Sequence, residues 1–352
     1  MVNDPDRLIR ILRGLWLFAA QRADLRRARA LADELLQLAE RQHDVVGLIE
    51  GHRIMATTLF HLGMFAEALD HVDRGLALYD PVEHSSRAFI YVQDPGVCCH
   101  AWRAWALWYL GYPDQAAISA QRSVELARQI GHPFSLSYAT NFAARLHLHR
   151  GEAGLAQEYA GEAVALAREQ GLTPMLAIGQ ILRGSSGTLL GHGDEAIHDL
   201  ADGVRLWRST GAVLVTPYWM YLHAEALDRA GRLLEAYGVL NEALVAAERS
   251  EERWFECEMY ILKASLFARV RGALPGRDPR VIARTDLHHA YHAATEMESP
   301  SLRLRAANAL SPLLREQGHL REARDLVCDA YETFKEGFQT ADLADAQAML
   351  GE

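Results

Sequence analysis

The sequence predicts an all-α solenoid of stacked antiparallel helix pairs, on the strength of three observations. Glycines recur at intervals of forty residues: Gly111, Gly151, Gly191 and Gly231. An alanine follows each of them by five positions: Ala116, Ala156, Ala196 and Ala236. Alanine and leucine dominate, and only 11 of the 352 residues are proline, a composition that favours helix. A fixed period of this size is typical of repeated supersecondary units.

Each forty-residue unit is expected to contain two helices, as residues 133–171 illustrate. Pro133 suits the first turn of a helix, where its missing N–H costs nothing. Apolar residues then follow at helical spacing as far as Gly151, which ends the first helix because glycine adopts the left-handed conformation cheaply. The second helix is expected from about 152 to 170, with Gly171 after it.

Small residues are expected where the two helices of a pair cross. Ala156 and Ala163 lie two helical turns apart on one face, and Ala144 would meet them from the partner helix. In the next unit Gly184 and Gly203 take the equivalent places. The order small–Gly–Ala–small is the tetratricopeptide signature, so we expect a right-handed TPR-like superhelix.

The repeat extends over the whole chain, which we expect to form one solenoid over 1–352. The eight expected units are 5–41, 43–80, 97–131, 133–171, 174–211, 214–249, 252–297 and 299–337. A C-terminal capping helix follows over 340–350, with Thr340 as its N-cap. Residues 80–96 form the one substantial insertion in the regular region. Such an insertion can lie on a binding face or can simply pack against the solenoid.

Charge and cysteine content limit the classes of function. The formal net charge of −10 argues against binding to nucleic acid, since an acidic surface repels phosphate. No run of about 18 apolar residues predicts a membrane-spanning helix, and the N-terminus lacks a signal-peptide pattern. None of the four cysteines forms a Cys-x-x-Cys pair. We therefore expect a cytoplasmic protein with reduced, buried cysteines.

Several stretches carry a resemblance to a known type of array. They are Tyr91–Val97, Trp105–Ala116, Gly131–Leu136, Glu252–Glu256 and Phe334–Leu343. They resemble the C-terminal long-helix tetratricopeptide arrays of bacterial adenylate/guanylate cyclase–ATPase proteins, which are STAND-type signalling proteins. Because the resemblance covers the array, it implies an interaction or sensor module and not the cyclase or ATPase part of such proteins. The chain departs from their ATPase part in having no Gly-x-x-x-x-Gly-Lys-Ser/Thr phosphate loop.

Three clusters invite a chemical interpretation, and each has a more ordinary one. His288 and His292 could face one metal from a helix, but no third ligand is evident, so no metal site is expected. The adjacent Cys98 and Cys99 lack a basic setting for redox chemistry. The aromatic stripe is more typical of a core between repeats than of a ligand platform; its members are Trp102, Trp105, Tyr109 and Tyr112. No catalytic motif is present, so we expect neither an enzyme nor a cofactor.

Polar residues of the first helices are the candidates for a binding site, because these helices line the concave face of such superhelices. The candidates are His52, Arg53, Arg103, Asn141, Arg145, Gln180, Arg183, Tyr221, Glu225, Glu256, Lys263, Arg303 and Asn308. Arginine and asparagine can pair with peptide carboxylates and amides. The leading hypothesis is recognition of a protein or peptide in a concave groove. The alternatives are a receptor for a peptide pheromone or small ligand that regulates an attached effector and, more remotely, an enzyme.

The first helix carries more apolar residues than one buried face requires. Ile9, Ile11, Leu12, Leu15, Trp16, Leu17 and Phe18 cover much of its circumference. An exposed apolar patch of this kind marks an interaction surface. We therefore expect this helix to contact an upstream domain, another chain or a second copy in a homo-oligomer.

Overall fold

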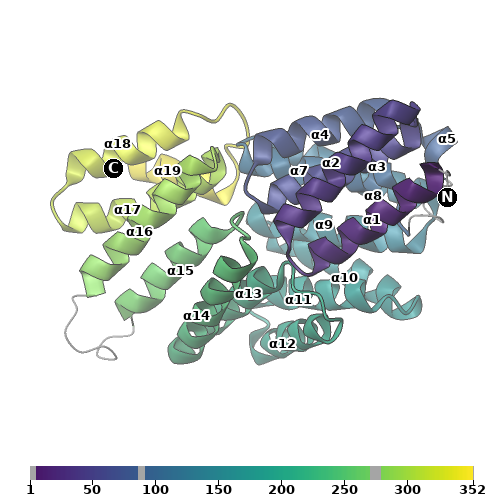
Figure 1. Ribbon diagram of the computed structural model, residues 1–352. Helices are drawn as coiled ribbons and strands as arrows, with labels where there is room; N and C mark the ends of the chain where they lie inside the picture. Colours follow the sequence, from purple (N-terminus) through teal and green to yellow (C-terminus); the bar gives the residue numbers. More distant parts are fainter. Residues whose placement is uncertain (1–4, 86–91, 270–278, 352) are drawn as a thin grey trace.

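The computed structural model describes residues 5–85, 92–269 and 279–351, and within them every element is a helix. The helices form consecutive antiparallel pairs (Figure 1). The first four pairs are α1 (Pro5–Gln21) with α2 (Leu25–Gln42), α3 (Val45–His61) with α4 (Phe65–Leu78), α7 (Pro95–Tyr109) with α8 (Pro113–Ile130), and α9 (Pro133–His149) with α10 (Ala153–Glu169). The next four are α11 (Thr173–Leu189) with α12 (Gly193–Ser209), α13 (Thr216–Arg229) with α14 (Leu233–Ser250), α15 (Glu256–Arg269) with α16 (Pro279–Glu296), and α17 (Pro300–Glu316) with α18 (Leu320–Tyr331). The expected eight pairs of a right-handed TPR-like solenoid are confirmed.

The helix ends follow the expected turn chemistry. Gly111, Gly151, Gly191 and Gly231 all have φ between 76° and 83°, the left-handed region that favours glycine. Prolines stand in the first turns of α7, α8, α9, α11, α13 and α17. The first helix of the seventh pair begins at Glu256 rather than at residue 252, because Trp254 and Phe255 lie in the preceding turn.

Methyl-sized residues occupy the helix crossings, as the forty-residue period predicts. Ala144, Ala156 and Ala163 are all fully buried. A Cβ on Gly184 would lie 2.5 Å from the carbonyl oxygen of Ala196, and one on Gly203 would lie 2.8 Å from the backbone nitrogen of Ile181. The two helices of this pair can therefore approach closely only because neither residue has a side chain.

The superhelix closes on itself, a feature that the repeat pattern does not predict. Turns within the first four pairs contact the loops between later pairs. The backbone contacts are Val213 N–H to Gln21 O at 2.7 Å and Arg253 N–H to His61 O at 3.2 Å. Two serine hydroxyls also donate to backbone carbonyl oxygens across the same boundary: Ser299 to Tyr109 and Ser301 to Trp108. Glu336 accepts from the backbone N–H groups of Asp114 and Gln115. We call this set the closure contacts.

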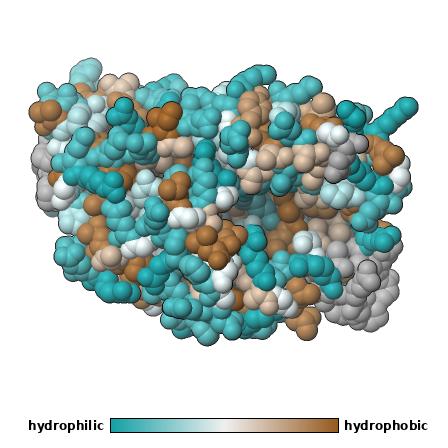
Figure 2. All heavy atoms as spheres, turned by 180° about the vertical axis from the view of Figure 1, so that it is seen from behind, coloured by the Kyte–Doolittle hydropathy of each residue, from teal (hydrophilic) through white to brown (hydrophobic). Residues whose placement is uncertain are grey.

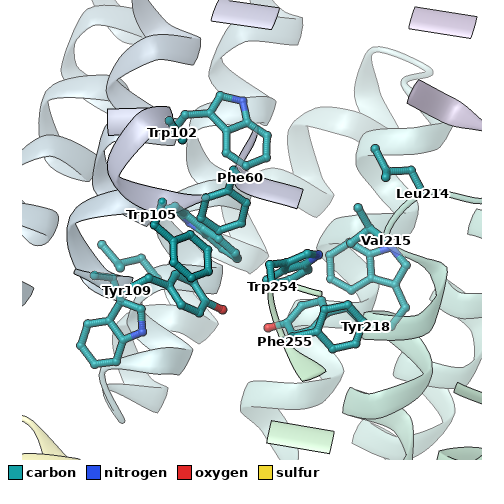
Figure 3. Close-up of a cluster of buried hydrophobic side chains, with 14 of the residues drawn as sticks. Phe60, Trp102, Trp105, Tyr109, Leu214, Val215, Tyr218, Trp254 and Phe255 are labelled. Carbon is teal, nitrogen blue, oxygen red and sulfur yellow. The ribbon is translucent and has the colours of Figure 1, made fainter. Parts of the chain in front are cut away.

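Closure turns the concave face into an interior filled with aromatic rings (Figure 3). Phe60, Trp105 and Tyr109 come from α3 and α7, and Tyr218, Trp254 and Phe255 lie at the start of α13 and just before α15. The Phe60 and Trp254 ring centroids are 5.6 Å apart, and those of Trp105 and Trp254 are 5.7 Å apart. The two halves of the chain therefore share one aromatic core.

The ends of the insertion are fastened to the solenoid. It contains a short helix α5 (Pro81–His84), and residues 86–91 lie outside the described ranges. The Tyr79 hydroxyl donates to Asp94, and the backbone N–H of Asp94 donates to Ser135 at the start of α9.

The C-terminal helix α19 (Ala341–Gly351) packs on α17 and α18, as expected for a capping helix. Thr340 directly precedes this helix, and its hydroxyl donates to the carbonyl oxygen of Gly337.

Helix α1 presents two apolar faces. Ile9, Leu12 and Trp16 are buried against the solenoid. Its exposed apolar side chains are Leu8, Ile11, Leu15, Leu17 and Phe18, the last with 66% of its surface accessible. None of the described helices has the length and hydropathy needed to span a bilayer.

Candidate functional site

Described residues from several helix pairs line two hollows between the coils of the superhelix, and a third, of about 490 Å³, lies beside Arg183 and Asp199 on α11 and α12. The larger of the two, which we call the groove, has a volume of about 690 Å³. Residues of α9, α11, α13, α15, α17 and α19 line it. Seen from the side opposite to Figure 1, the surface is mostly hydrophilic with scattered apolar patches (Figure 2). The groove falls in the size range of ligand sites in proteins, roughly 300–1,000 Å³.

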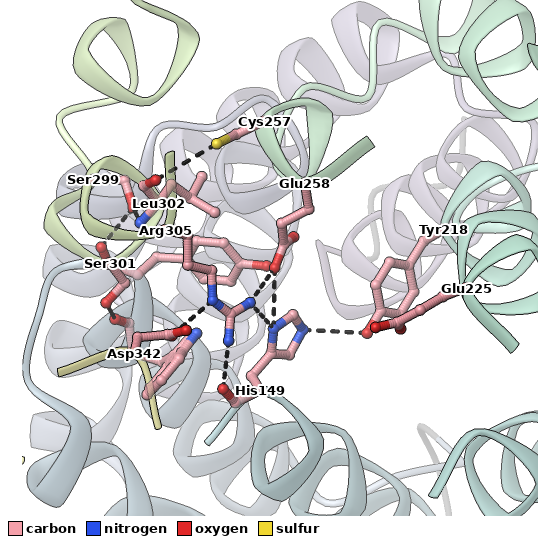
Figure 4. Close-up of polar contacts among 12 residues, drawn as sticks. His149, Tyr218, Glu225, Cys257, Glu258, Ser299, Ser301, Leu302, Arg305 and Asp342 are labelled. Atoms are coloured by element: carbon pink, nitrogen blue, oxygen red, sulfur yellow. Dashed lines mark hydrogen bonds and ion pairs between the residues drawn. The ribbon is translucent and has the colours of Figure 1, made fainter. Parts of the chain in front are cut away.

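A polar network centred on Arg305 forms one wall of the groove (Figure 4). The Arg305 guanidinium donates to Asp342 at 2.7 Å, to Glu258 and to the carbonyl oxygen of His149. Nδ1 of His149 lies 3.1 Å from Nη1 of Arg305 and 3.3 Å from Oε1 of Glu258, and Nε2 of the same ring lies 3.2 Å from the Tyr218 hydroxyl. The network thus joins α9, α13, α15, α17 and α19, which are far apart in sequence.

Burial and pairing set the charges in this network. Burial alone would raise the pKa of Glu258, but attraction to His149 and Arg305 and their hydrogen bonds lower it overall. Burial lowers the pKa of His149, and the neighbouring Glu258 offsets part of that shift. One oxygen of Glu258, Oε2, and the amide oxygen of Asn308, Oδ1, are buried without a hydrogen-bond partner among the described residues. Two residues that line the groove thus each carry a buried acceptor without a donor in the described part of the chain.

Acidic groups outnumber basic ones along the described lining of the groove. The carboxylates are Glu225, Glu258, Asp342 and Asp345, and the guanidinium groups are Arg229 and Arg305. Glu225 pairs with Arg229 at 3.1 Å on the half-exposed surface of α13, where solvent weakens such a pair. The groove is therefore suited to a ligand that brings hydrogen-bond donors or positive charge.

The smaller hollow, which we call the Arg145 cavity, has a volume of about 160 Å³ and lies between the N-terminal helices and the start of α13. Its apolar walls include Trp16, Trp102, Phe142, Trp207 and Trp219. Its polar residues include Arg53, Thr57, His61, Asn141 and Arg145. Gln93, at the end of the insertion, also borders it.

Arg145 is held in this cavity without a charged partner. Only 4% of its surface is accessible, and no described residue accepts a hydrogen bond from its Nε or Nη2. Its Cζ lies 3.0 Å from the centroid of the Trp105 ring and 5.4 Å from that of Trp254. Burial lowers its pKa to about 9, so it remains charged at neutral pH. An unpaired buried charge is costly, typically by several kcal/mol, and ring contacts offset only part of that cost.

The structure brings six of the thirteen sequence candidates to these two hollows. Tyr221, Glu225 and Asn308 line the groove. Arg53, Asn141 and Arg145 line the Arg145 cavity. Asn141 and Arg145, one helical turn apart on α9, thus border the same hollow.

The other candidates lie outside these two hollows, and most of them pair with a second helix. Arg103 bonds to Asp73 at 2.7 Å, Arg183 to Asp199 at 2.7 Å and Lys263 to Asp286 at 2.8 Å. Nδ1 of His52 lies 2.9 Å from Nδ1 of His71, and Glu256 contacts Arg253 and His289. Gln180 and Arg303 are half-buried on α11 and α17. The sequence spacing placed these residues on first helices correctly but did not specify which side of the helix faces the interior.

The remaining clusters have ordinary environments. His288 lies near Arg284, and His292 faces Glu296. The described residues contain no group of three or more His, Cys, Asp or Glu side chains arranged to hold a metal. Cys98 and Cys99 are buried, and burial raises the pKa of both thiols. The aromatic stripe is core at Trp102, Trp105 and Tyr109, as expected, whereas Tyr112 is exposed.

Sequence reasoning missed the centre of the polar network. His149, Glu258 and Arg305 meet from three different pairs, and none of them stood out by spacing. One signal was present: polar residues sit at otherwise apolar positions of α15 and α17. A buried position for a charged residue predicts a partner but does not identify it.

Part of a longer protein is similar in sequence to this chain. No protein-family model matches it. An uncharacterized protein of Rhizobium meliloti (strain 1021) is 25% identical over 260 residues. The match covers 72% of this chain and 24% of that protein, so the chain spans about a quarter of its relative's length.

Solved structures share the fold. A Rap protein complexed with competence and sporulation factor has a TM-score of 0.61 at 13% identity, covering 98% of this chain and 97% of that one. NprR in complex with its cognate peptide NprX has a TM-score of 0.61 at 12% identity, covering 97% and 95%. A STAND protein with a tetratricopeptide repeat sensor, from Pyrococcus horikoshii, has a TM-score of 0.50 at 11% identity, covering 94% and 47%. These neighbours are TPR-like helical repeat proteins.

Proposed function

We propose that this chain is a protein- or peptide-binding module that recognises an extended segment of its partner in the groove. The observation that carries the proposal is the pair of buried acceptors in the groove wall, Glu258 Oε2 and Asn308 Oδ1. Backbone N–H groups of an extended peptide are donors that could satisfy both. The peptide complex of NprR, which shares the fold, supports the same reading.

The acidic lining points to the kind of segment that would bind. The four carboxylates of the groove favour a peptide with a lysine, an arginine or a free amino terminus. The polar network fixes the wall before a ligand arrives, because Arg305 is held from several sides. A preformed wall lowers the entropic cost of binding. We propose recognition by this rigid surface and assign no catalytic role.

The context that we propose is a bacterial signalling protein in which this array is the sensor or scaffold. The resemblance to long-helix arrays of cyclase–ATPase proteins supports it, as does the fold shared with a STAND protein's tetratricopeptide sensor. We further propose that the exposed apolar side of α1 contacts another domain, another chain or a second copy. Sedimentation showing a strict monomer, together with no binding of a hydrophobic dye, would argue against that contact.

The groove is tested by blocking it at an exposed position. Ser265 on α15 lines the groove and is exposed, so Ser265→Trp narrows it without entering the core. Ser209, exposed at the end of α12 and away from the groove, gives Ser209→Trp as the matched control. The purified chain and both variants are probed on an array of immobilised short peptides, basic, neutral and acidic.

The expected result is that basic peptides bind to the wild type and to Ser209→Trp but not to Ser265→Trp. If no peptide signal distinguishes the two variants, the groove is not the recognition site.

A further inference from the structure

The Arg145 cavity, which the proposed function does not use, has the charge of an anion site. Its described lining contains two guanidinium groups, Arg53 and Arg145, and no carboxylate. Arg53 already has a carboxylate partner, because its Nε and Nη2 donate to the two oxygens of Glu50. The positive charge of Arg145 is therefore unbalanced in a buried space.

The geometry around Arg145 leaves one edge of its guanidinium unused. Aromatic rings contact the face of the group, with Trp105 closest at 3.0 Å from Cζ to ring centroid. A ring on the face cannot accept the N–H groups, which lie in the plane of the guanidinium. The two donors without an acceptor are Nε and Nη2. Arg53 and Arg183 use this same edge to grip the carboxylates of Glu50 and Asp199.

Further unpaired groups border the same cavity. Nε2 of His61 and Nε1 of Trp219 are both buried without a partner in the described part of the chain. The amide oxygen of Asn141 is likewise buried without a hydrogen-bond partner among the described residues. Nε1 of Trp219 is a donor that a carboxylate can satisfy. Nε2 of His61 and the Asn141 oxygen are acceptors, since Nδ1 of His61 lies 2.8 Å from the Thr57 carbonyl oxygen and donates to it. The unpaired donors that border the hollow therefore include those of Arg145 and Trp219.

The size and the walls of the cavity define the rest of that occupant. A volume of about 160 Å³ is close to that of an engineered protein cavity, about 150 Å³, that takes up benzene. The walls are aromatic and aliphatic, including Phe142, Met175 and Ile178. The space therefore suits one ring or a branched aliphatic group beside the carboxylate position.

We propose that the Arg145 cavity binds a monocarboxylate that carries an apolar group of about the size of one ring. The carboxylate pairs with Nε and Nη2 of Arg145, and the apolar group packs against the tryptophans. The same chemistry is offered by a free small acid and by the C-terminal residue of a peptide. This site is separate from the groove and does not depend on the proposed function.

Three probes distinguish these sources by isothermal titration of the purified full chain. They are phenylacetate, its neutral analogue phenylacetamide, and the tripeptide Gly-Gly-Phe with a free carboxylate. Phenylacetate is expected to bind at least about tenfold more tightly than phenylacetamide, because a charged hydrogen-bond pair to Arg145 is lost in the amide. Binding of the tripeptide in place of phenylacetate would assign the carboxylate to a peptide C-terminus.

Two variants locate the site. Arg145→Met keeps the length of the side chain and removes the guanidinium, so binding of the acid is expected to disappear. Ile178→Trp fills the cavity from a half-buried position, and Ile130→Trp, half-buried at the end of α8, is its matched control. Ser265→Trp, which blocks the groove, should leave the titration unchanged.

The proposal is wrong if neither phenylacetate nor the tripeptide binds to the wild type at millimolar concentration. It is also wrong if binding persists in Arg145→Met. Should Arg145→Met fail to fold, loss of binding in Ile178→Trp with retention in Ile130→Trp supports the site, and retention in both overturns it.

Discussion

The hydroxyl of Ser299 donates to the backbone carbonyl of Tyr109, 190 residues earlier in the chain, over 2.7 Å. This bond joins the loop before α17 to the end of α7 and brings the later pairs against the earlier ones. The neighbouring Ser301 makes the equivalent bond to Trp108. The two serines thus hold together parts of the solenoid that nearest-neighbour stacking alone would leave apart.

Removing one of these hydroxyls should weaken the closure. Ser301→Ala is expected to lower the free energy of unfolding by about 1 kcal/mol, the usual net contribution of a buried hydrogen bond. Urea titration followed by circular dichroism measures the loss. The matched control, Ser209→Ala, removes an exposed hydroxyl that bonds only within its own helix, and it should change stability little. Equal effects in the two variants would contradict the role of the closure contact.

Replacing a glycine with alanine should destabilise the fold at a helix crossing but not at an uncrowded position within a helix. Gly184→Ala places a Cβ 2.5 Å from the Ala196 carbonyl oxygen, so it should cost about 1–3 kcal/mol through overpacking. Gly161, inside α10, has no atom within 4 Å of an added Cβ, so Gly161→Ala should stabilise by roughly 0.5–1 kcal/mol. Opposite shifts in the urea midpoint are the expected outcome, and shifts of the same sign would refute the crossing argument.

Removing the positive charge of Arg305 from the polar network should lower the free energy of unfolding. Arg305→Met leaves Glu258, which is buried, without its guanidinium partner, and this should cost about 3 kcal/mol. Arg183→Met breaks an ion pair with Asp199 that is partly exposed, and it should cost less than about 1 kcal/mol. Chemical denaturation of both variants measures the difference. A cost for Arg305→Met as small as that for Arg183→Met would show that the network contributes little to stability.

Acid should destabilise the fold through buried histidines. Burial, with a further contribution from the charge of Arg145, lowers the pKa of His61 to about 4, against an ordinary value of about 6.5. Because the folded-state pKa is the lower one, the unfolded chain takes up the proton first. The contribution of neutral His61 is therefore complete above about pH 6.5 and is lost progressively as the pH falls toward 4.

The loss assigned to His61 is of the order of 3 kcal/mol, from about 1.36 kcal/mol per pKa unit. His61→Gln should shrink the difference in unfolding free energy between about pH 7.5 and about pH 4.5. It should not abolish the difference, because burial also lowers the pKa of His52 and His100 to about 4. His43→Gln, at an exposed position, is the control. An unchanged pH dependence in His61→Gln would show that this ring is not responsible.

The local parts of the fold could be predicted because single units encode them. Gly151 and Pro133 mark helix ends through backbone conformation alone, and Gly184 and Gly203 mark a crossing through their missing side chains. The closure could not be predicted in the same way. It depends on the small rotation between each helix pair and the next. These rotations accumulate over the whole array, so their total cannot be inferred from the sequence of one unit.

The candidate sites likewise combine features that one unit encodes with contacts that form only when the superhelix closes. Asn141 and Arg145 could be proposed from the sequence because the repeat assigns them to a first helix, and both border the Arg145 cavity. The contacts of Arg305 with His149 and Glu258 were not found, since they exist only after closure. Arg183 and Lys263 were selected because they share the first helices, yet their partners lie on the second helices. The forty-residue period assigns a residue to a first or a second helix, but it does not specify which neighbouring helix its side chain meets.

The serine bonds to Tyr109 and Trp108 also bear on how the molecule responds to mechanical force. An open array yields under tension one unit at a time, because each unit contacts only its neighbours. In this molecule, the later helix pairs must separate from the earlier pairs before any single unit can unfold. Stretching between the two termini is therefore expected to show one dominant rupture, followed by smaller and more regular steps.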